Sequence, residues 1–306
     1  MQISGEPLQR HEGPRDMSEA IRTEPTSLPI VNPLGGTLGA EVHGIDLRQP
    51  VSDAQFEVVE RAFLQHLVLV FRNQPIDDAQ HLSFASRFGE LDHHINKPTR
   101  HHQHERVQVF SNVKADGTTL GYHPERGTLV WHTDKSYMAY PSLATILRSP
   151  QIANHGGDTL FANCQRAYDD LDEHRKNQIA ELRAVHSWKR NREKVGEKPA
   201  TPEQLAAAPP VEHPLVRTHP VTGRKSLYLG AHTSHIADME QAAGETLLAS
   251  LERHATQSKY VYVHKWQTND VLMWDNRGTM HCVTPYDATN EKRTIHRVVV
   301  KGDRPY

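Results

Sequence analysis

The stretch "DVLMWDNRGTMH" (Asp270–His281) joins an apolar run to a histidine. Its first half is rich in the aliphatic and aromatic side chains that fill a buried strand. The polar residues that follow, Asn276–Gly278, are typical of a turn. We therefore predict a strand, a turn and then a return of the chain that ends at His281.

Similar short runs occur on both sides of this stretch. Strands are expected at "LVLVF", "VQVFSNV", "LATILR", "SLYLG", "YVYVHKW" and "RTIHRVVV", and a hairpin at "LGGTLGAEVHGIDL". Helical spacing predicts helices over residues 52–66, 77–89, 167–185 and 239–254. Many short strands around a few helices favour a mainly β fold, a β-sandwich or jelly roll with helical additions.

The domain organisation also follows from composition along the chain. Residues 1–27 are polar, with scattered proline, glycine and charge, which predicts a flexible N-terminal tail. Residues 28–306 contain no repeat or clear linker, so we expect a single domain. Within it, the charged stretch 189–214, rich in proline and alanine, predicts a surface excursion or lid.

Overall composition narrows the class of protein. The formal net charge of -2 argues against nucleic-acid or anionic-membrane partners. No apolar run approaches the roughly 20 residues that span a bilayer, and the first residues lack the apolar core of a signal peptide. The only cysteines, Cys164 and Cys282, cannot make a disulfide framework. We expect a cytoplasmic protein that forms a homo-oligomer.

A pair of metal-binding side chains lies in "VWHTDKSY" (Val130–Tyr137), where His132 and Asp134 are two residues apart. On a strand, such residues point to the same side. Non-haem iron(II) sites combine two histidines with one carboxylate. With 22 histidines, one His-x-Asp is expected by chance, so a second, distant histidine is required. His281 is the best candidate, although a core histidine remains the alternative reading.

The C-terminal strand suggests an anion site. In "KRTIHRVVV", Arg293, Ile295 and Arg297 share one face. A buried guanidinium needs an anionic partner, which a bound dianion could supply. The alternative is a solvent-facing arginine pair on an edge strand. In "NHGGDTLFAN", a tight turn at Gly156–Gly157 precedes Thr159, whose hydroxyl could help hold a carboxylate.

Histidines also gather in "LDHHINKPTRHHQHER" (Leu91–Arg106), which contains five of them. Such a stretch can bind metal, but a solvated loop is the more common outcome, and we expect one here.

These motifs occur in one order along the chain: "WHTD", "GGDT", "HPVTGRKSLYLG", "WDNRGTMH" and "RTIHR". From Leu34 to Asp303, this combination resembles the taurine dioxygenase and 2,4-dichlorophenoxyacetate dioxygenase family of iron(II)/2-oxoglutarate-dependent oxygenases. The resemblance implies a double-stranded β-helix, which is a distorted jelly roll.

The resemblance also implies roles for individual residues. It assigns His132, Asp134 and His281 as iron ligands, Arg293 and Thr159 to 2-oxoglutarate, His94 and Arg297 to the prime substrate, and Trp274 to packing beside the metal. Two positions depart from the taurine enzyme, which has a tyrosine in place of Lys97 and an asparagine in place of Thr128. We therefore expect a conserved type of cofactor pocket and a changed substrate pocket.

The activity implied by the resemblance uses iron(II), 2-oxoglutarate and O2. We expect hydroxylation of a C–H of a small anionic organic substrate (a sulfonate, carboxylate, aryloxyacid or sulfate ester), with succinate and CO2 as co-products. Alternatives are desaturation or biosynthetic oxidation of an amino-acid-like substrate, a zinc site, and a non-catalytic jelly-roll protein that binds a metal or anion.

Overall fold

The computed structural model describes residues 27–93, 101 and 103–306. Most of the predicted N-terminal tail and the candidate substrate residue His94 therefore lie outside the described residues, as does Lys97. No helix within the described ranges is long and apolar enough to cross a membrane.

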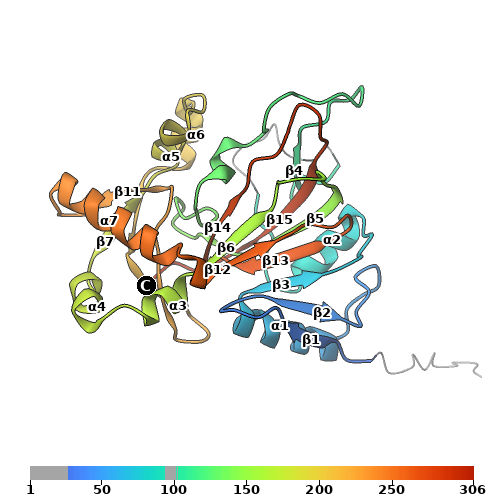
Figure 1. The fold of residues 1–306 in the computed structure, drawn as a ribbon, viewed down its shortest axis with the longest axis horizontal. Coiled ribbons are helices and arrows are strands. Elements are labelled where there is room, and N and C mark those ends of the chain that lie inside the picture. The colour runs from blue at the N-terminus through green and yellow to red at the C-terminus, as the bar shows by residue number, and fades with distance from the viewer. Residues whose placement is uncertain (1–26, 94–100, 102) are drawn as a thin grey trace, which may run out of the picture.

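A seven-stranded sheet forms the larger layer of the fold (Figure 1). Its order is β1 (Ile30–Pro33), β2 (Ala40–His43), β3 (Val68–Phe71), β13 (Val271–Asp275), β5 (Ser142–Gln151), β15 (Thr294–Lys301) and β4 (Gln108–Ser111). Neighbours are antiparallel except for β2 and β3, which run parallel. Every residue of β3 and β13 is buried, as expected for apolar strands in the middle of a sheet.

A three-stranded antiparallel sheet makes the second layer, in the order β12 (Val261–His264), β6 (Thr159–Asn163) and β14 (Thr279–Val283). The predicted turn at Asn276–Gly278 connects β13 of the first sheet to β14 of the second. This arrangement of two sheets confirms the predicted jelly roll.

Side chains on the two faces of the large sheet enter different cores, because successive strand residues point to opposite faces. Leu69 and Phe71 pack with helices α1 (Asp53–His66) and α2 (Asp78–Ser86). Val68 and Val70 instead face Phe161 of the small sheet. The helices thus cover the outer face, and the space between the sheets is left for a site.

The predicted helices at the N-terminal end of the fold are confirmed, and their caps explain where they begin. Ser52 makes a reciprocal capping box with Gln55 at the start of α1, and Asp77 does the same with Gln80 at the start of α2. The predicted helix at residues 239–254 is also confirmed as α7 (Gln241–Ala255).

The helical pattern predicted over residues 167–185 is confirmed only in part, because the last residues form a strand. The chain forms α3 (Cys164–Asp169), α4 (Glu173–Ile179) and strand β7 (Arg183–His186). Asp172 caps the backbone amide of Arg175 and so begins a new helix. β7 is a strand because it pairs on both sides, with β8 (Val211–Pro214) and with β11 (Thr233–Ile236), and this tertiary pairing overrides local helical spacing.

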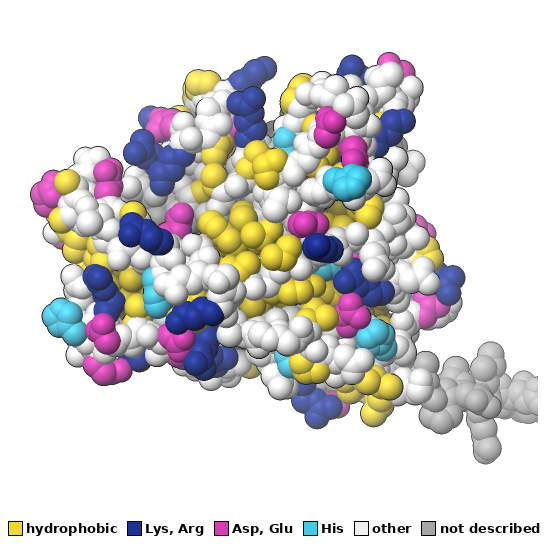
Figure 2. All heavy atoms as spheres, viewed as in Figure 1, with side chains coloured by type: hydrophobic (Ala, Val, Ile, Leu, Met, Phe, Trp, Pro, Cys, Tyr) yellow, Lys and Arg dark blue, Asp and Glu magenta, His cyan; other side chains and the backbone are white. Residues whose placement is uncertain are grey.

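The remaining elements lie around these sheets. They are the short helices η2 (Arg126–Leu129), α5 (Trp188–Val195), α6 (Pro202–Ala207) and η3 (Ser258–Tyr260), and the paired strands β9 (Val216–Thr218) and β10 (Lys225–Leu227). The stretch 189–214 thus folds as most of α5, then α6 and β8, and its role as a lid stays a prediction. Figure 2 shows side chains of both charges interspersed over one face, in keeping with the small net charge.

Candidate metal centre

The segment that carries His132 and Asp134 is not the regular strand that the sequence suggested. His132 forms an isolated antiparallel bridge with His281 of β14, and a turn begins at Asp134. The backbone amide of His132 donates to the carbonyl of His281 at 3.0 Å, and the amide of His281 donates to the carbonyl of His132 at 2.8 Å. Main-chain pairing between His132 and His281 therefore sets the distance between these two residues.

The side chains of His132, Asp134 and His281 converge on one point. One ligand atom from each lies within 4.8 Å of the others, and all three residues are buried. His281 Nε2 is 3.7 Å from Asp134 Oδ2, and the two imidazole centroids are 4.1 Å apart. Two imidazoles and one carboxylate fit a non-haem iron(II) centre that keeps other positions open.

Hydrogen bonds orient the histidine and the carboxylate. His132 Nδ1 lies 2.8 Å from the carbonyl oxygen of Val130, which leaves Nε2 for a metal. Thr145 Oγ1 donates to Asp134 Oδ2 at 2.6 Å. Asn276 connects this pair to the core, because its Nδ2 donates to Thr145 Oγ1 and its Oδ1 accepts from the backbone amide of Asp134.

Trp274 packs against His281 of the candidate centre. Its ring centroid is 4.5 Å from that of His281. Its indole Nε1 donates to Asn276 Oδ1 at 3.0 Å, so Trp274 also positions the amide that supports Asp134. Packing and polar support thus come from the same side chain.

The electrostatic environment favours the metal-binding forms of all three groups. Burial lowers the pKa of His132, and burial together with His132 lowers the pKa of His281 well below its usual value. Burial alone would raise the pKa of Asp134, but the Arg297 guanidinium and the hydrogen bond from Thr145 lower it well below its usual range. Neutral imidazoles and an ionised carboxylate are the forms that bind metal.

A cavity beside the centre, here called the Arg293 cavity, is lined among others by Thr159, Trp274, His281, Arg293 and Ile295. Arg293 is only 7% exposed, so the alternative of a solvent-facing edge is wrong. Its Nη2 donates to the carbonyl of Gly157 at 3.2 Å.

In the described part of the chain no carboxylate lies within ion-pair distance of Arg293. Burial lowers the pKa of its guanidinium to about 10. Thr159 Oγ1 accepts from Trp266 Nε1 at 3.0 Å and keeps its own proton to donate. A buried cation next to a free hydroxyl proton is an environment that suits a carboxylate.

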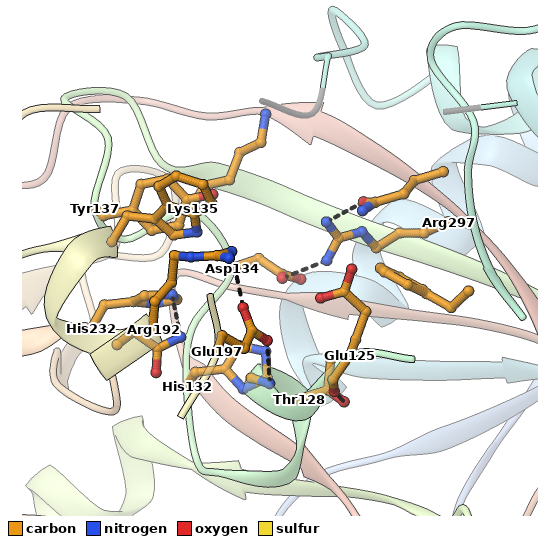
Figure 3. A pocket seen from close by; sticks show the side chains of 15 residues that line it. Glu125, Thr128, His132, Asp134, Lys135, Tyr137, Arg192, Glu197, His232 and Arg297 are labelled. Atoms are coloured by element: carbon orange, nitrogen blue, oxygen red, sulfur yellow. Dashed lines mark hydrogen bonds and ion pairs between the residues drawn. The ribbon is translucent and has the colours of Figure 1, made fainter. Parts of the chain in front are cut away.

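A second cavity, here called the Trp188 cavity, shares Arg297 with the Arg293 cavity, and Figure 3 shows the side chains that line it. Its wall includes side chains from α5 and from the segment after Asp134, namely Lys135, Tyr137, Trp188, Asn191 and Arg192. Phe110, Glu125, Thr128, His132 and Arg297 line both cavities.

Arg297 has partners within the protein. Its Nη1 donates to Asp134 Oδ1 at 3.0 Å, and its Nη2 donates to Gln108 Oε1 at 2.5 Å. The two arginines of "RTIHR" therefore differ, because Arg297 contacts the metal-centre carboxylate and Arg293 does not. Thr128 Oγ1 donates to the backbone carbonyl of Glu125, so its hydroxyl contributes to the local turn of η2.

Sequence reasoning missed several residues of this site. Thr145 was read only as a strand residue of "LATILR", and Asn276 only as a turn former. Their contacts to Asp134 cross 11 and 142 residues of chain. Glu125 and Trp188 carry no local motif, so only the fold reveals that they reach the cavities.

Comparisons with known proteins agree with this geometry. The model of the taurine catabolism dioxygenase TauD, TfdA family matches residues 30–299. An alpha-ketoglutarate-dependent 2,4-dichlorophenoxyacetate dioxygenase of Burkholderia sp. (strain RASC) is 36% identical over 272 residues, which cover 86% of this chain and 91% of the relative. An alpha-ketoglutarate-dependent sulfate ester dioxygenase of Pseudomonas putida is 32% identical and covers 94% of each chain.

A similar solved structure is that of AAD-2 in complex with Mn(II) and N-oxalylglycine. It has a TM-score of 0.82 and 36% sequence identity, and the match covers 91% of this chain and 98% of that one.

Proposed function

Because the chain belongs to the TauD, TfdA family and is therefore a non-haem iron(II)- and 2-oxoglutarate-dependent dioxygenase, we propose that His132, Asp134 and His281 are its metal ligands. The observation that carries this assignment is the convergence of three buried ligand atoms within 4.8 Å of one another. When bound, iron(II) with 2-oxoglutarate and O2 supplies the oxidising power to hydroxylate a C–H, with succinate and CO2 as co-products.

Arg293 and Thr159 bind the distal carboxylate of 2-oxoglutarate in this proposal. The support is the lack of a carboxylate partner for Arg293 among the described residues, together with the free hydroxyl proton of Thr159 in the same cavity. A carboxylate bound there would offset the buried positive charge and accept charge-assisted hydrogen bonds.

The prime substrate occupies the Trp188 cavity, and Arg297 contacts its anionic group. Arg297 lines both cavities and lies next to Asp134, so a substrate held there has its reacting carbon close to the metal centre. Trp188, Asn191 and Arg192 reach this cavity from α5, which supports the predicted role of residues 189–214 as a lid.

The relatives suggest the kind of substrate. Their names specify 2,4-dichlorophenoxyacetate and sulfate esters, both small organic anions. We infer that this enzyme hydroxylates a C–H of a small organic acid. Where the hydroxylated carbon bears an aryl ether, sulfonate or sulfate oxygen, the product collapses and releases that group.

The test measures metal, co-substrate and turnover separately. Anaerobic iron(II) and 2-oxoglutarate should give a visible charge-transfer band with the wild-type protein and none with Asp134→Ala. Succinate should form in proportion to an accepted substrate from a panel of sulfonates, aryloxyacids, sulfate esters and amino acids. A band or substrate-dependent succinate that persists in Asp134→Ala would contradict the ligand assignment, and absence of the band in the wild type would favour a zinc site.

The division between the two arginines has its own test. Arg293→Ala should raise the KM for 2-oxoglutarate at least a hundredfold. Arg297→Ala should chiefly raise the KM for the prime substrate. Equal damage to 2-oxoglutarate binding in both variants would refute the separate roles.

A further inference from the structure

Glu125 places a carboxylate at the boundary of the two cavities. It is the residue before η2 and lines both the Arg293 cavity and the Trp188 cavity. Figure 3 shows its carboxylate pointing into the cavity on the side of Arg297. Nothing in the sequence marked this residue, because it belongs to no motif.

Among the described residues, no side chain or backbone amide donates a hydrogen bond to this carboxylate. The bonds that involve Glu125 use its main chain: its carbonyl accepts from the amide and the hydroxyl of Thr128, and its amide donates to His123 Nδ1. Glu125 is half-buried, so its carboxylate has lost part of its hydration and, among the described residues, receives no hydrogen bond in return.

The lysine and the two arginines that line the Trp188 cavity do not form an ion pair with Glu125, because each is already paired with another carboxylate. The described pairs are Arg297 with Asp134 at 3.0 Å, Arg192 with Glu197 at 2.9 Å, and Lys135 with Asp92 at 2.6 Å. Among the described residues that line this cavity, Glu125 is therefore the acidic group without an ion-pair partner.

A sum of the charges at the centre with iron(II) and 2-oxoglutarate bound also indicates that Glu125 lacks a partner. This step rests on the proposed function. The charges of iron(II) and Arg293 offset those of Asp134 and the two carboxylates of 2-oxoglutarate. Asp134 competes less for Arg297 once it ligates a cation. One guanidinium, Arg297, and one carboxylate, Glu125, then remain to face the substrate, and together they complement a molecule that carries both charges.

We propose that Glu125 determines substrate specificity and that the prime substrate is zwitterionic: an organic acid whose anionic group contacts Arg297 and whose ammonium or other cationic group contacts Glu125. Such a cation makes the charge-assisted hydrogen bond that no described residue donates to Glu125. A purely anionic substrate instead brings a like charge toward Glu125. Burial and the nearby Glu197 raise the pKa of Glu125 to about 7, against the opposing effect of the Arg297 and Arg192 guanidinium groups.

The experiment compares pairs of acids that differ only in the cation. One pair is 6-aminohexanoate and heptanoate, in which a methyl group replaces the ammonium; shorter and longer pairs and 4-(aminomethyl)phenoxyacetate with 4-ethylphenoxyacetate extend the panel. Substrate-dependent succinate formation gives kcat/KM, and the thermal shift of the protein loaded with Mn(II) and 2-oxoglutarate gives binding without turnover. Wild-type protein should favour the best zwitterion over its methyl isostere at least tenfold in both measurements.

Glu125→Gln keeps the size of the side chain and removes its charge, so this preference should fall at least tenfold. Glu125→Asp should recover part of it. Glu193→Gln is the matched control, because its carboxylate on helix α5 pairs with Lys189 and Arg190 and lines neither cavity. It should affect both members of each pair alike.

Two results would overturn the proposal: methyl isosteres that bind and react better than every zwitterion, or a preference that is the same in wild type and Glu125→Gln. Either result leaves the dioxygenase assignment intact. By contrast, absence of the iron–2-oxoglutarate band in wild-type protein would refute the proposed function itself, and this inference with it.

Discussion

Replacing Arg293 by methionine should stabilise the ligand-free protein and abolish its response to 2-oxoglutarate. The guanidinium is 7% exposed, and burial lowers its pKa from 12.5 to about 10. That change corresponds to a cost of about 3 kcal/mol for keeping the charge in the fold. Methionine has a similar length and no charge, so it removes this cost.

The substitution also loses the hydrogen bond from Arg293 to the carbonyl of Gly157. A hydrogen bond of this kind contributes about 1 kcal/mol. The net gain for ligand-free Arg293→Met is therefore about 2 kcal/mol in the free energy of unfolding. For a chain of this size we expect Tm to rise by about 4 °C.

The assay is denaturant unfolding of metal-free protein, repeated with saturating Mn(II) and 2-oxoglutarate. Wild type should gain about 2.7 kcal/mol at a 2-oxoglutarate concentration one hundred times Kd, whereas Arg293→Met should gain nothing beyond the effect of the metal alone. Arg293→Lys keeps the charge and should show no increase in ligand-free stability. The reasoning is refuted if Arg293→Met is less stable than wild type without ligand, or if 2-oxoglutarate still stabilises it.

Three further outcomes are expected. Asp134→Ala should weaken Mn(II) binding at least a hundredfold without loss of secondary structure, measured by equilibrium dialysis and circular dichroism; a normal metal content would contradict its role. Gly157→Ala should raise the KM for 2-oxoglutarate about tenfold, because Gly157 has a φ of +68° and an added Cβ would lie 3.0 Å from Arg293 Nε; an unchanged KM would show that Arg293 adapts freely. Because the carboxyl of Glu125 ionises near its raised pKa of about 7, affinity for a zwitterionic substrate should rise as the pH increases through 7 and level off about one pH unit higher, and a flat calorimetric profile would count against that contact.

Sequence reasoning succeeded where a local pattern carries the information. Ser52 and Asp77 mark the starts of α1 and α2 because the capping box is a contact within four residues. The shared face of Arg293 and Arg297 follows from strand alternation, and both line the Arg293 cavity. His281 could be selected because it follows a recognisable strand and turn, which can bring a distant histidine to a His-x-Asp pair.

The failures have a common cause, which is tertiary pairing. The strand expected around His132 is a single bridge to His281. The helix expected over residues 167–185 is divided, since β7 pairs with β8 and β11. Arg297 was assigned to the substrate alone, whereas in the structure it also binds Asp134. Glu125 could not be identified from the sequence. It was selected because no described residue donates a hydrogen bond to its carboxylate, and only the structure can show this.

Because of the main-chain bridge between His132 and His281, the backbone geometry of this centre does not depend on the side chains that bind the metal. Two backbone hydrogen bonds hold the positions at which imidazoles are presented, and neither bond uses a side chain. Substitution of either histidine should therefore leave the backbone positions of residues 132 and 281 unchanged. Relatives that drift away from iron chemistry can keep the fold at little cost, and an engineer can install other donors, or a cavity for free imidazole, in a scaffold that already fixes their spacing.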